Sequence, residues 1–198
     1  MPSSIDNRKD ILLLLLYSPG LTQAVNEPIT GRTRLMKMLF LFKEEALKHF
    51  RSGIAIDSGN FYQFFPWDFG PFSLQVYDDL TFFELRGFIA RDDAEEETLP
   101  EAAAEWEKWI NMSGSNSDEV VMSEYDEQVF RLTLKGEQFA GELFSLLSAE
   151  QKHLLQEFKA RLLAAPLRAL LKYVYEHFEE QTTKSKIKER VLGQRSSG

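Results

Sequence analysis

The strongest constraint on the fold is a run of seven apolar or aromatic residues, Ile11 to Tyr17. It forms the second half of a predicted helix over residues 5–17, and that half has no polar face. A helix that is apolar on every side is buried on every side, so other elements must surround it. Seven residues cannot cross about 30 Å of hydrocarbon, which takes about twenty. We therefore predict a central core helix, ended by Ser18, Pro19 and Gly20.

The composition is that of a globular chain with a well-filled core. Of the 198 residues, 43% are hydrophobic and sixteen are Phe, which suits one domain with a helical appendage. There is no cysteine, so a disulfide scaffold and a thiolate metal site are excluded. The N-terminus has no signal-peptide pattern. We expect a cytoplasmic protein that does not contact a membrane.

Charge is distributed very unevenly along the chain. The net charge is -8, but the segment from Asp92 to Glu127 holds thirteen acids and only one base, Lys108. That segment carries -12, so the rest of the chain carries +4. The sequence therefore describes a mildly basic body with one strongly acidic insertion, and the net charge alone does not exclude nucleic acid.

Apolar periodicity predicts the elements before this insertion. A helix over 33–50 follows the central one, with the loop 26–31 between them. An aromatic strand over 61–67 comes next. Gly70 and Pro71 are expected to start a third helix, which closes at Gly87 before a short strand over 88–90.

The second half of the chain is predicted in the same way. A surface helix over 100–112 lies in the acidic insertion, and two strands, 119–125 and 128–132, flank a tight turn. Thr133 caps a helix to about residue 147. Ser148 and Gln151 form a capping box for the next helix, which Pro166 interrupts. An amphipathic helix over 167–178 and a basic tail over 183–195 end the chain.

This order of helices and strands is typical of a winged helix-turn-helix, in a mainly helical α+β class. We predict a winged-helix domain over 1–147 with an acidic wing insertion at about 92–118. A helical C-terminal extension with a basic tail covers 148–198. An unspecified helix-rich bundle is the competing interpretation.

Three stretches resemble the Panacea group, phage-associated and antitoxin-like proteins of bacteria and archaea. They are Arg34 to Phe42, Gly70 to Leu80, and Phe130 to Gly136. The resemblance implies a non-catalytic regulator linked to toxin–antitoxin systems, adaptor roles or defence. It assigns no functional residues, and the acidic insertion and helical C-terminus depart from the group's pattern.

If the fold binds DNA, basic and polar residues on two helices and the tail are the candidates. The helix before a recognition helix crosses the phosphate backbone, and polar side chains of the recognition helix read bases. The candidate DNA-binding residues are Arg32, Arg34, Lys37, Ser73, Gln75, Lys184, Lys186 and Lys188. Asp78 and Asp79, predicted to face outward on the same recognition helix, would repel phosphate and weaken this interpretation. For the tail, simple solvation is the plainer alternative.

Aromatic residues are the candidates for binding a protein partner. Seven aromatic residues lie between Phe61 and Phe72, and most of them are expected in the core. Outward members suit a protein interface, as do tryptophans within the acidic insertion. The candidate partner-binding residues are Tyr62, Trp67, Trp106 and Trp109.

Catalysis finds little support. The three histidines, His49, His153 and His177, fall on separate predicted helices without ligand spacing. No phosphate-binding loop, zinc-protease or nucleophile-elbow motif occurs in the sequence. We therefore predict no catalytic residue, no metal and no cofactor.

The prediction for function is a non-enzymatic regulator of the antitoxin or defence type that acts by binding a protein, such as a toxin or defence component. The alternative is a DNA-binding transcriptional regulator. Either would be served by a homodimer through the helix over 167–178, whose apolar stripe could instead seal the core.

Overall fold

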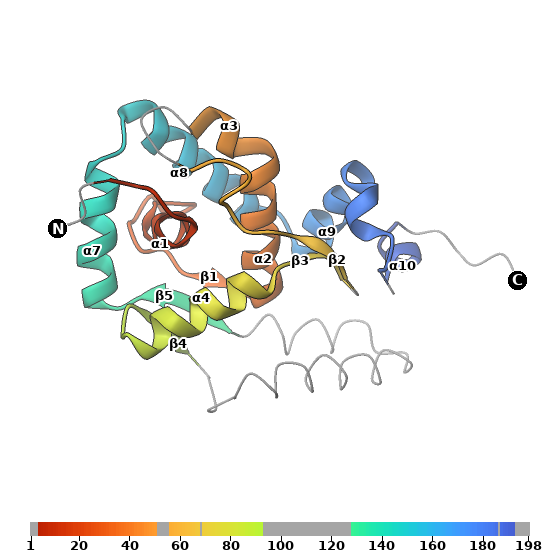
Figure 1. Cartoon of the computed structure of the whole chain (residues 1–198), viewed down its shortest axis with the longest axis horizontal. Coiled ribbons are helices and arrows are strands. Elements are labelled where there is room, and N and C mark those ends of the chain that lie inside the picture. The colour runs from red at the N-terminus through yellow and green to blue at the C-terminus, as the bar shows by residue number, and fades with distance from the viewer. Residues whose placement is uncertain (1–3, 51–55, 68, 93–127, 186, 193–198) are drawn as a thin grey trace, which may run out of the picture.

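The computed structural model describes residues 4–50, 56–67, 69–92, 128–185 and 187–192, and these form a mainly helical α+β structure. Helix α1 (Arg8–Tyr17) runs through its centre. Figure 1 looks nearly along α1, with α7 (Leu134–Ser145), α8 (Ala149–Ala164) and α2 (Arg32–Leu41) around it. Every residue from Ile11 to Leu16 is fully buried, as the sequence predicted. Within the described residues, no helix is long and apolar enough to span a bilayer.

Both ends of the buried helix α1 are satisfied by specific polar groups. At its start, Asn7 and Asp10 form a capping box. At its end, the Lys159 ammonium on α8 donates hydrogen bonds of 2.7–2.8 Å to the carbonyls of Leu16, Ser18 and Glu27. Unpaired buried carbonyls would be destabilising, so Lys159 is a structural part of the core.

The long helix predicted over 33–50 is one continuous rod with a π-helical turn in it. It comprises α2, the π-helix η1 (Phe42–Ala46) and α3 (Leu47–Phe50). Periodicity does not reveal a π-turn, because it adds only one residue to a helical turn. Phe42 in this turn packs edge-on against the rings of Phe50 and Phe158.

A three-stranded antiparallel sheet closes one side of the core, in the order β1-β5-β4. The strands are β1 (Ile29–Thr30), β4 (Ile89–Asp92) and β5 (Val129–Leu132). The sequence predicted β4 and β5 but wrongly placed β1 in a loop. A two-residue strand has no periodicity to detect, and its pairing with β5 is set by a segment far along the chain.

The third predicted helix begins later than expected. Gly70 and Pro71 belong to β3 (Gly70–Phe72), which pairs with β2 (Phe65–Trp67) as a hairpin, and α4 (Leu74–Leu85) starts after Ser73. Gly70 has a φ of +83°, a conformation that suits glycine and starts the returning strand. The prediction of a helix from Gly70 is therefore wrong by four residues.

The C-terminal helices follow the predicted caps. Thr133 caps α7, and the capping box of Ser148 and Gln151 starts α8. Pro166 separates α8 from α9 (Leu167–His177), and the 3-10 helix η2 (Glu179–Thr182) and α10 (Lys188–Leu192) follow. Buried residues of α8 and α9 belong to the same hydrophobic cluster as α1 and α2. The N-terminal and C-terminal segments therefore share one core.

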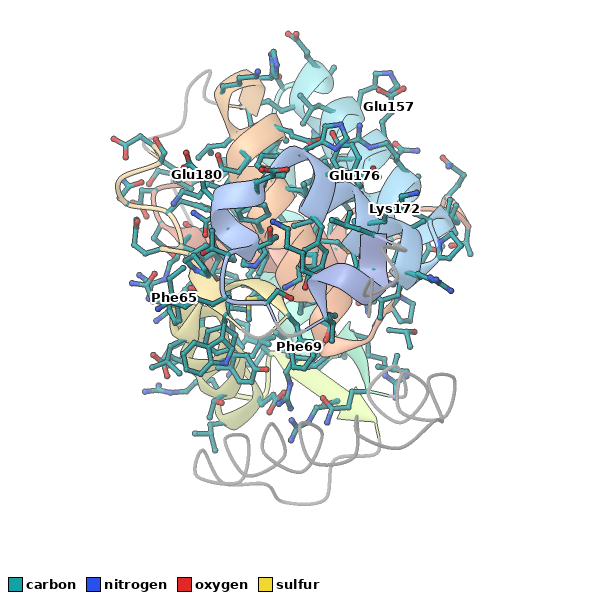
Figure 2. The ribbon with its side chains drawn as sticks, turned by 90° about the vertical axis from the view of Figure 1, so that its right-hand side faces the viewer. Phe65, Phe69, Glu157, Lys172, Glu176 and Glu180 are labelled. Carbon is teal, nitrogen blue, oxygen red and sulfur yellow. The ribbon has the colours of Figure 1, made fainter. Side chains whose placement is uncertain are left out.

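The apolar stripe of α9 faces this core, and its outer face is polar. The buried members are Leu167, Leu170, Leu171, Val174 and Tyr175. Lys172 and Glu176 lie on the outer face, with 3.6 Å between Nζ and Oε1 (Figure 2). The stripe is therefore not available to a second copy, which removes the apolar surface on which the expected dimer through residues 167–178 depended.

Several predictions fall outside the described residues. They include the helix over 100–112, the strand over 119–125, the acidic insertion from residue 93 onward, and the candidate residues Trp106, Trp109 and Lys186.

Gly136 provides a test of how α7 packs on the sheet. A Cβ atom built at this position would lie 2.0 Å from the carbonyl oxygen of Phe88. Because the Phe88 carbonyl is backbone and cannot turn aside as a side chain can, Gly136→Ala should destabilise the protein by about 1–3 kcal/mol in urea unfolding.

Gly141→Ala on the same helix is the matched control. Its Cβ would lie 3.2 Å from the Tyr17 hydroxyl, the end of a side chain that can move. Helix propensity then favours alanine by up to about 1 kcal/mol. Equal effects of the two substitutions would contradict the close packing of Gly136.

Candidate functional site

The two arginines at the start of α2 are half-buried and contact other elements of the fold. The Arg34 guanidinium donates two hydrogen bonds of 2.7 Å to the carbonyls of Leu162 and Ala165, at the C-terminal end of α8. A cation at the C-terminal end of a helix also interacts favourably with the helix dipole. The Arg32 guanidinium lies 4.9 Å from the ring centre of Tyr77. These contacts give both arginines structural partners, which the DNA-binding prediction did not anticipate.

Lys37 is the clearest correction among the predicted phosphate-binding residues. It is only 3% exposed, and its ammonium donates a 2.8 Å hydrogen bond to the Pro71 carbonyl on β3. Burial lowers the pKa of Lys37 to about 7. A side chain in this position anchors the hairpin to α2 and cannot reach a nucleic acid.

Two other predicted site residues are also buried. Ser73 is 0% exposed and precedes α4, so it is not available to read bases. Tyr62 is 0% exposed, and burial with the nearby Asp79 carboxylate raises its pKa well above 10. Tyr62 is therefore a core residue and not a contact for a partner.

The remaining described candidates are at least partly accessible. Gln75 accepts a 2.9 Å hydrogen bond from the Gln63 backbone, Lys184 is exposed, and Lys188 is half-buried. Trp67 is 42% exposed, on the strand β2. Of the described predicted contacts, Trp67 is the one that presents a large aromatic surface to solvent.

A buried carboxylate fixes the position of α4 against the start of α1. Asp79 is 2% exposed, although the sequence predicted an outward position for it. Its oxygens lie 2.8 Å from Arg8 Nε and 3.6 Å from Lys9 Nζ. Such a pair is strongly coupled when it is removed from water, so it sets which face of α4 points outward.

The outward face of α4 is largely apolar. It carries Leu74, Phe82 and Leu85, which are 53%, 38% and 83% exposed, together with the exposed Asp78. Leu74, Phe82 and Leu85 thus expose large apolar side chains on one face of the helix, with Asp78 between Leu74 and Phe82, and exposed apolar side chains gathered on one face are typical of a binding site. This apolar face was not predicted, because polar residues of the helix were expected at the outward positions.

Apolar residues extend this surface at both ends of α4. At its N-terminal end, Phe65 and Trp67 of the hairpin are 41% and 42% exposed, with their ring centres 5.9 Å apart. At its C-terminal end, Leu134 of α7 is 75% exposed. Figure 1 shows α4 lying between the hairpin and the start of α7. We call these residues, with Leu74, Asp78, Phe82 and Leu85, the α4 surface.

Cations border the α4 surface. The Lys9 ammonium lies 4.1 Å and the Arg86 guanidinium 5.3 Å from the ring centre of Phe82. Lys135 donates a 2.8 Å hydrogen bond to the Arg86 carbonyl, beside the exposed Leu134. Cation–π contacts of this kind stabilise the exposed ring. The stripe therefore has cations along its border, while the acidic residue Asp78 lies within it, between Leu74 and Phe82.

Apart from the α4 surface, the structure has an open groove between η1, α3 and α8. The groove has a volume of about 740 Å³ and is lined in part by Glu45, His49, His153 and Glu157. The fold thus brings together two histidines that the sequence placed on separate helices. His153 Nε2 lies 3.4 Å from Glu157 Oε1, and no group of three or more possible ligands in the described residues could hold a metal ion.

Comparison with known proteins adds no further constraint. No protein-family model matches the chain, and neither a curated protein nor a solved structure matches it. The resemblance to the Panacea group therefore stays a prediction from sequence motifs, and the function has to be argued from the surface itself.

The buried Lys37 predicts a pH-dependent stability. Its pKa is about 7 in the folded protein and about 10.5 when unfolded, so the unfolded chain binds more protons between these values. Folding stability should therefore rise with pH through this window and be lost as pH falls toward 7. Between about pH 6 and pH 9, Lys37 should account for an increase of about 2–3 kcal/mol in the free energy of unfolding.

Urea unfolding of wild type and Lys37→Met at several pH values would measure this contribution. The difference between them isolates Lys37, because Lys159, whose pKa burial also lowers, is present in both. Lys48→Met, which removes an exposed lysine on α3, serves as the control and should keep the wild-type slope. An unchanged slope in Lys37→Met would show that Lys37 does not titrate in this range.

Proposed function

We propose that this chain is a non-enzymatic winged-helix regulator whose α4 surface binds a protein and does not bind duplex DNA. The observation that carries the proposal is the exposed apolar stripe of Leu74, Phe82 and Leu85 along α4. A helix in the major groove faces a dense row of phosphates. Apolar side chains gain nothing from those phosphates but contribute strongly when a protein covers them.

The winged-helix part of the proposal is supported by the order of elements. Helix α1, strand β1, helices α2 and α4, and strands β4 and β5 follow one another, and the sheet order is β1-β5-β4. In a winged helix with this order of elements, α4 would be the recognition helix and residues 93–128 would connect the two wing strands. The hairpin β2–β3 is an addition between the second and third helices.

The regulatory part extends the resemblance to antitoxin-like proteins. An antitoxin acts by occupying a partner, which requires an exposed surface and no catalytic centre. The α4 surface meets the first requirement, with exposed aromatic and aliphatic anchors and a polar rim. A toxin or other defence component is the kind of partner that this proposal names.

DNA binding is the alternative, and the cations around α4 are what favour it. Arg86 and Lys135 are exposed, at the end of the helix that would enter the groove. However, Lys37 and Ser73 are buried and Arg34 is bonded to α8. The set of phosphate contacts expected from the sequence is thus much reduced, and protein binding is the better-supported function.

Two measurements with the same variant separate the functions. In affinity capture from cells of the native host, wild type should retain a partner that Leu85→Glu loses. Leu85 is highly exposed, so the charge should not disturb folding but would have to be buried in the complex. Leu146→Glu, at an exposed position at the other end of α7, is the matched control and should retain the partner.

The second measurement is fluorescence anisotropy with the duplex upstream of the protein's own gene, at about 50 to 200 mM salt. We expect no tight binding. Salt-dependent binding that is lost in Arg86→Ala/Lys135→Ala and kept in Leu85→Glu would establish the DNA-binding alternative and refute protein binding through α4.

A further inference from the structure

The α4 surface has the features of a self-complementary interface. We infer that its occupant is a second copy of this chain, with the two α4 helices packed antiparallel about a two-fold axis. This inference rests on the proposed function, because it uses the same surface, and it assigns that surface to a second copy in place of a toxin or other defence component. It also moves the expected dimer from α9, whose apolar stripe is buried, to α4.

The exposed residues of α4 lie on one narrow face. With about 100° per residue, Leu74, Asp78, Phe82 and Leu85 fall within an arc of about 80°. The buried residues Val76, Leu80 and Phe83 lie on the opposite side. From Leu74 to Leu85 this stripe is about 17 Å long. A single flat stripe of this length suits contact with another helix.

A two-fold axis near the middle of α4 would place the stripe of one copy against the same stripe of the second copy. In an antiparallel pair centred close to residue 80, Leu74 of one copy lies opposite Leu85 of the other. Asp78 then lies opposite Phe82. Both pairings occur twice, as an isologous interface requires.

The charges agree with this register. Asp78 is exposed and makes no ion pair within the described part of the chain. The second copy's Phe82 would lie opposite Asp78. In each copy the Lys9 ammonium lies 4.1 Å and the Arg86 guanidinium 5.3 Å from the centre of the Phe82 ring. Each Asp78 would therefore approach two cations across the interface. A purely acidic partner would instead bring like charge to Asp78, in the middle of the stripe.

The size of the surface predicts a weak, concentration-dependent dimer. A typical stable interface buries about 800 Å² on each partner, which is more than one twelve-residue helix face provides. The exposed Phe65 and Trp67 at one end and Leu134 at the other add to it. In the antiparallel arrangement the hairpin of each copy lies toward the Leu134 end of the second copy.

Size-exclusion chromatography with light scattering on the full chain, from about 5 to 500 µM, tests the inference. Wild type should shift from monomer to dimer, and Leu85→Glu should weaken the dimer by about tenfold or more. Leu146→Glu, outside the α4 surface, should dimerise like wild type. Circular dichroism melting confirms that each variant is folded.

Charge reversal tests the register. Asp78→Arg should weaken the dimer, because the new cation faces Lys9 and Arg86 of the second copy. Adding Arg86→Glu should recover a substantial part of the loss, because opposite charges again face each other. Failure of this rescue would overturn the antiparallel register.

A wild type that stays monomeric, or a dimer that survives Leu85→Glu, would overturn the inference as a whole. The proposed function is judged separately. A monomeric protein that still captures a different partner through Leu85 would keep protein binding and refute only the second copy. A monomer that captures nothing would refute both.

Discussion

The rest of the structure depends on burying α1 on every side. Residues 11–16 have no exposed surface, so the helix provides its full apolar circumference to the core and needs elements all around it. Its C-terminal end is buried with it, so water cannot satisfy the carbonyls there. The Lys159 ammonium does so instead, while the Asn7–Asp10 capping box satisfies N–H groups at the more exposed start of the helix. The apolar half of α1 can therefore end inside the protein.

The need to satisfy buried backbone carbonyls also explains where three of the basic residues direct their charge. Lys159, Arg34 and Lys37 each direct their charge to backbone carbonyls of another element. A cation bonded in this way joins two segments and is withdrawn from solvent. The positive charge that the sequence suggests for phosphate binding is thus partly used in assembling the fold, and apolar side chains are left exposed on α4.

Features that depend on residues close together in the sequence were predicted correctly. The caps at Thr133 and Ser148 and the stripe of α9 are defined by residues within one helix, and the structure contains all three. Strand β1 and the hairpin were missed because their partners are distant or their strands very short. The burial of Lys37 and Tyr62 was missed because it depends on Pro71 and Asp79, which only the fold brings near. The residues of the candidate surface were predicted least well, because the exposure of a side chain depends on the tertiary structure.

Asp78 and Asp79 show how the fold decides function at neighbouring positions. They are the same residue type on the same helix, yet Asp79 is buried against Arg8 and Lys9 while Asp78 is exposed. Rotating α4 by about 100° so that Asp78 took the place of Asp79 would move the Asp79 carboxylate further into the core and turn Leu85 away from the outward face. The ion pair at Asp79 penalises that rotation, because it would separate the buried Asp79 carboxylate from the cations of Arg8 and Lys9. The pair that holds α4 in place therefore also determines which of its side chains are exposed.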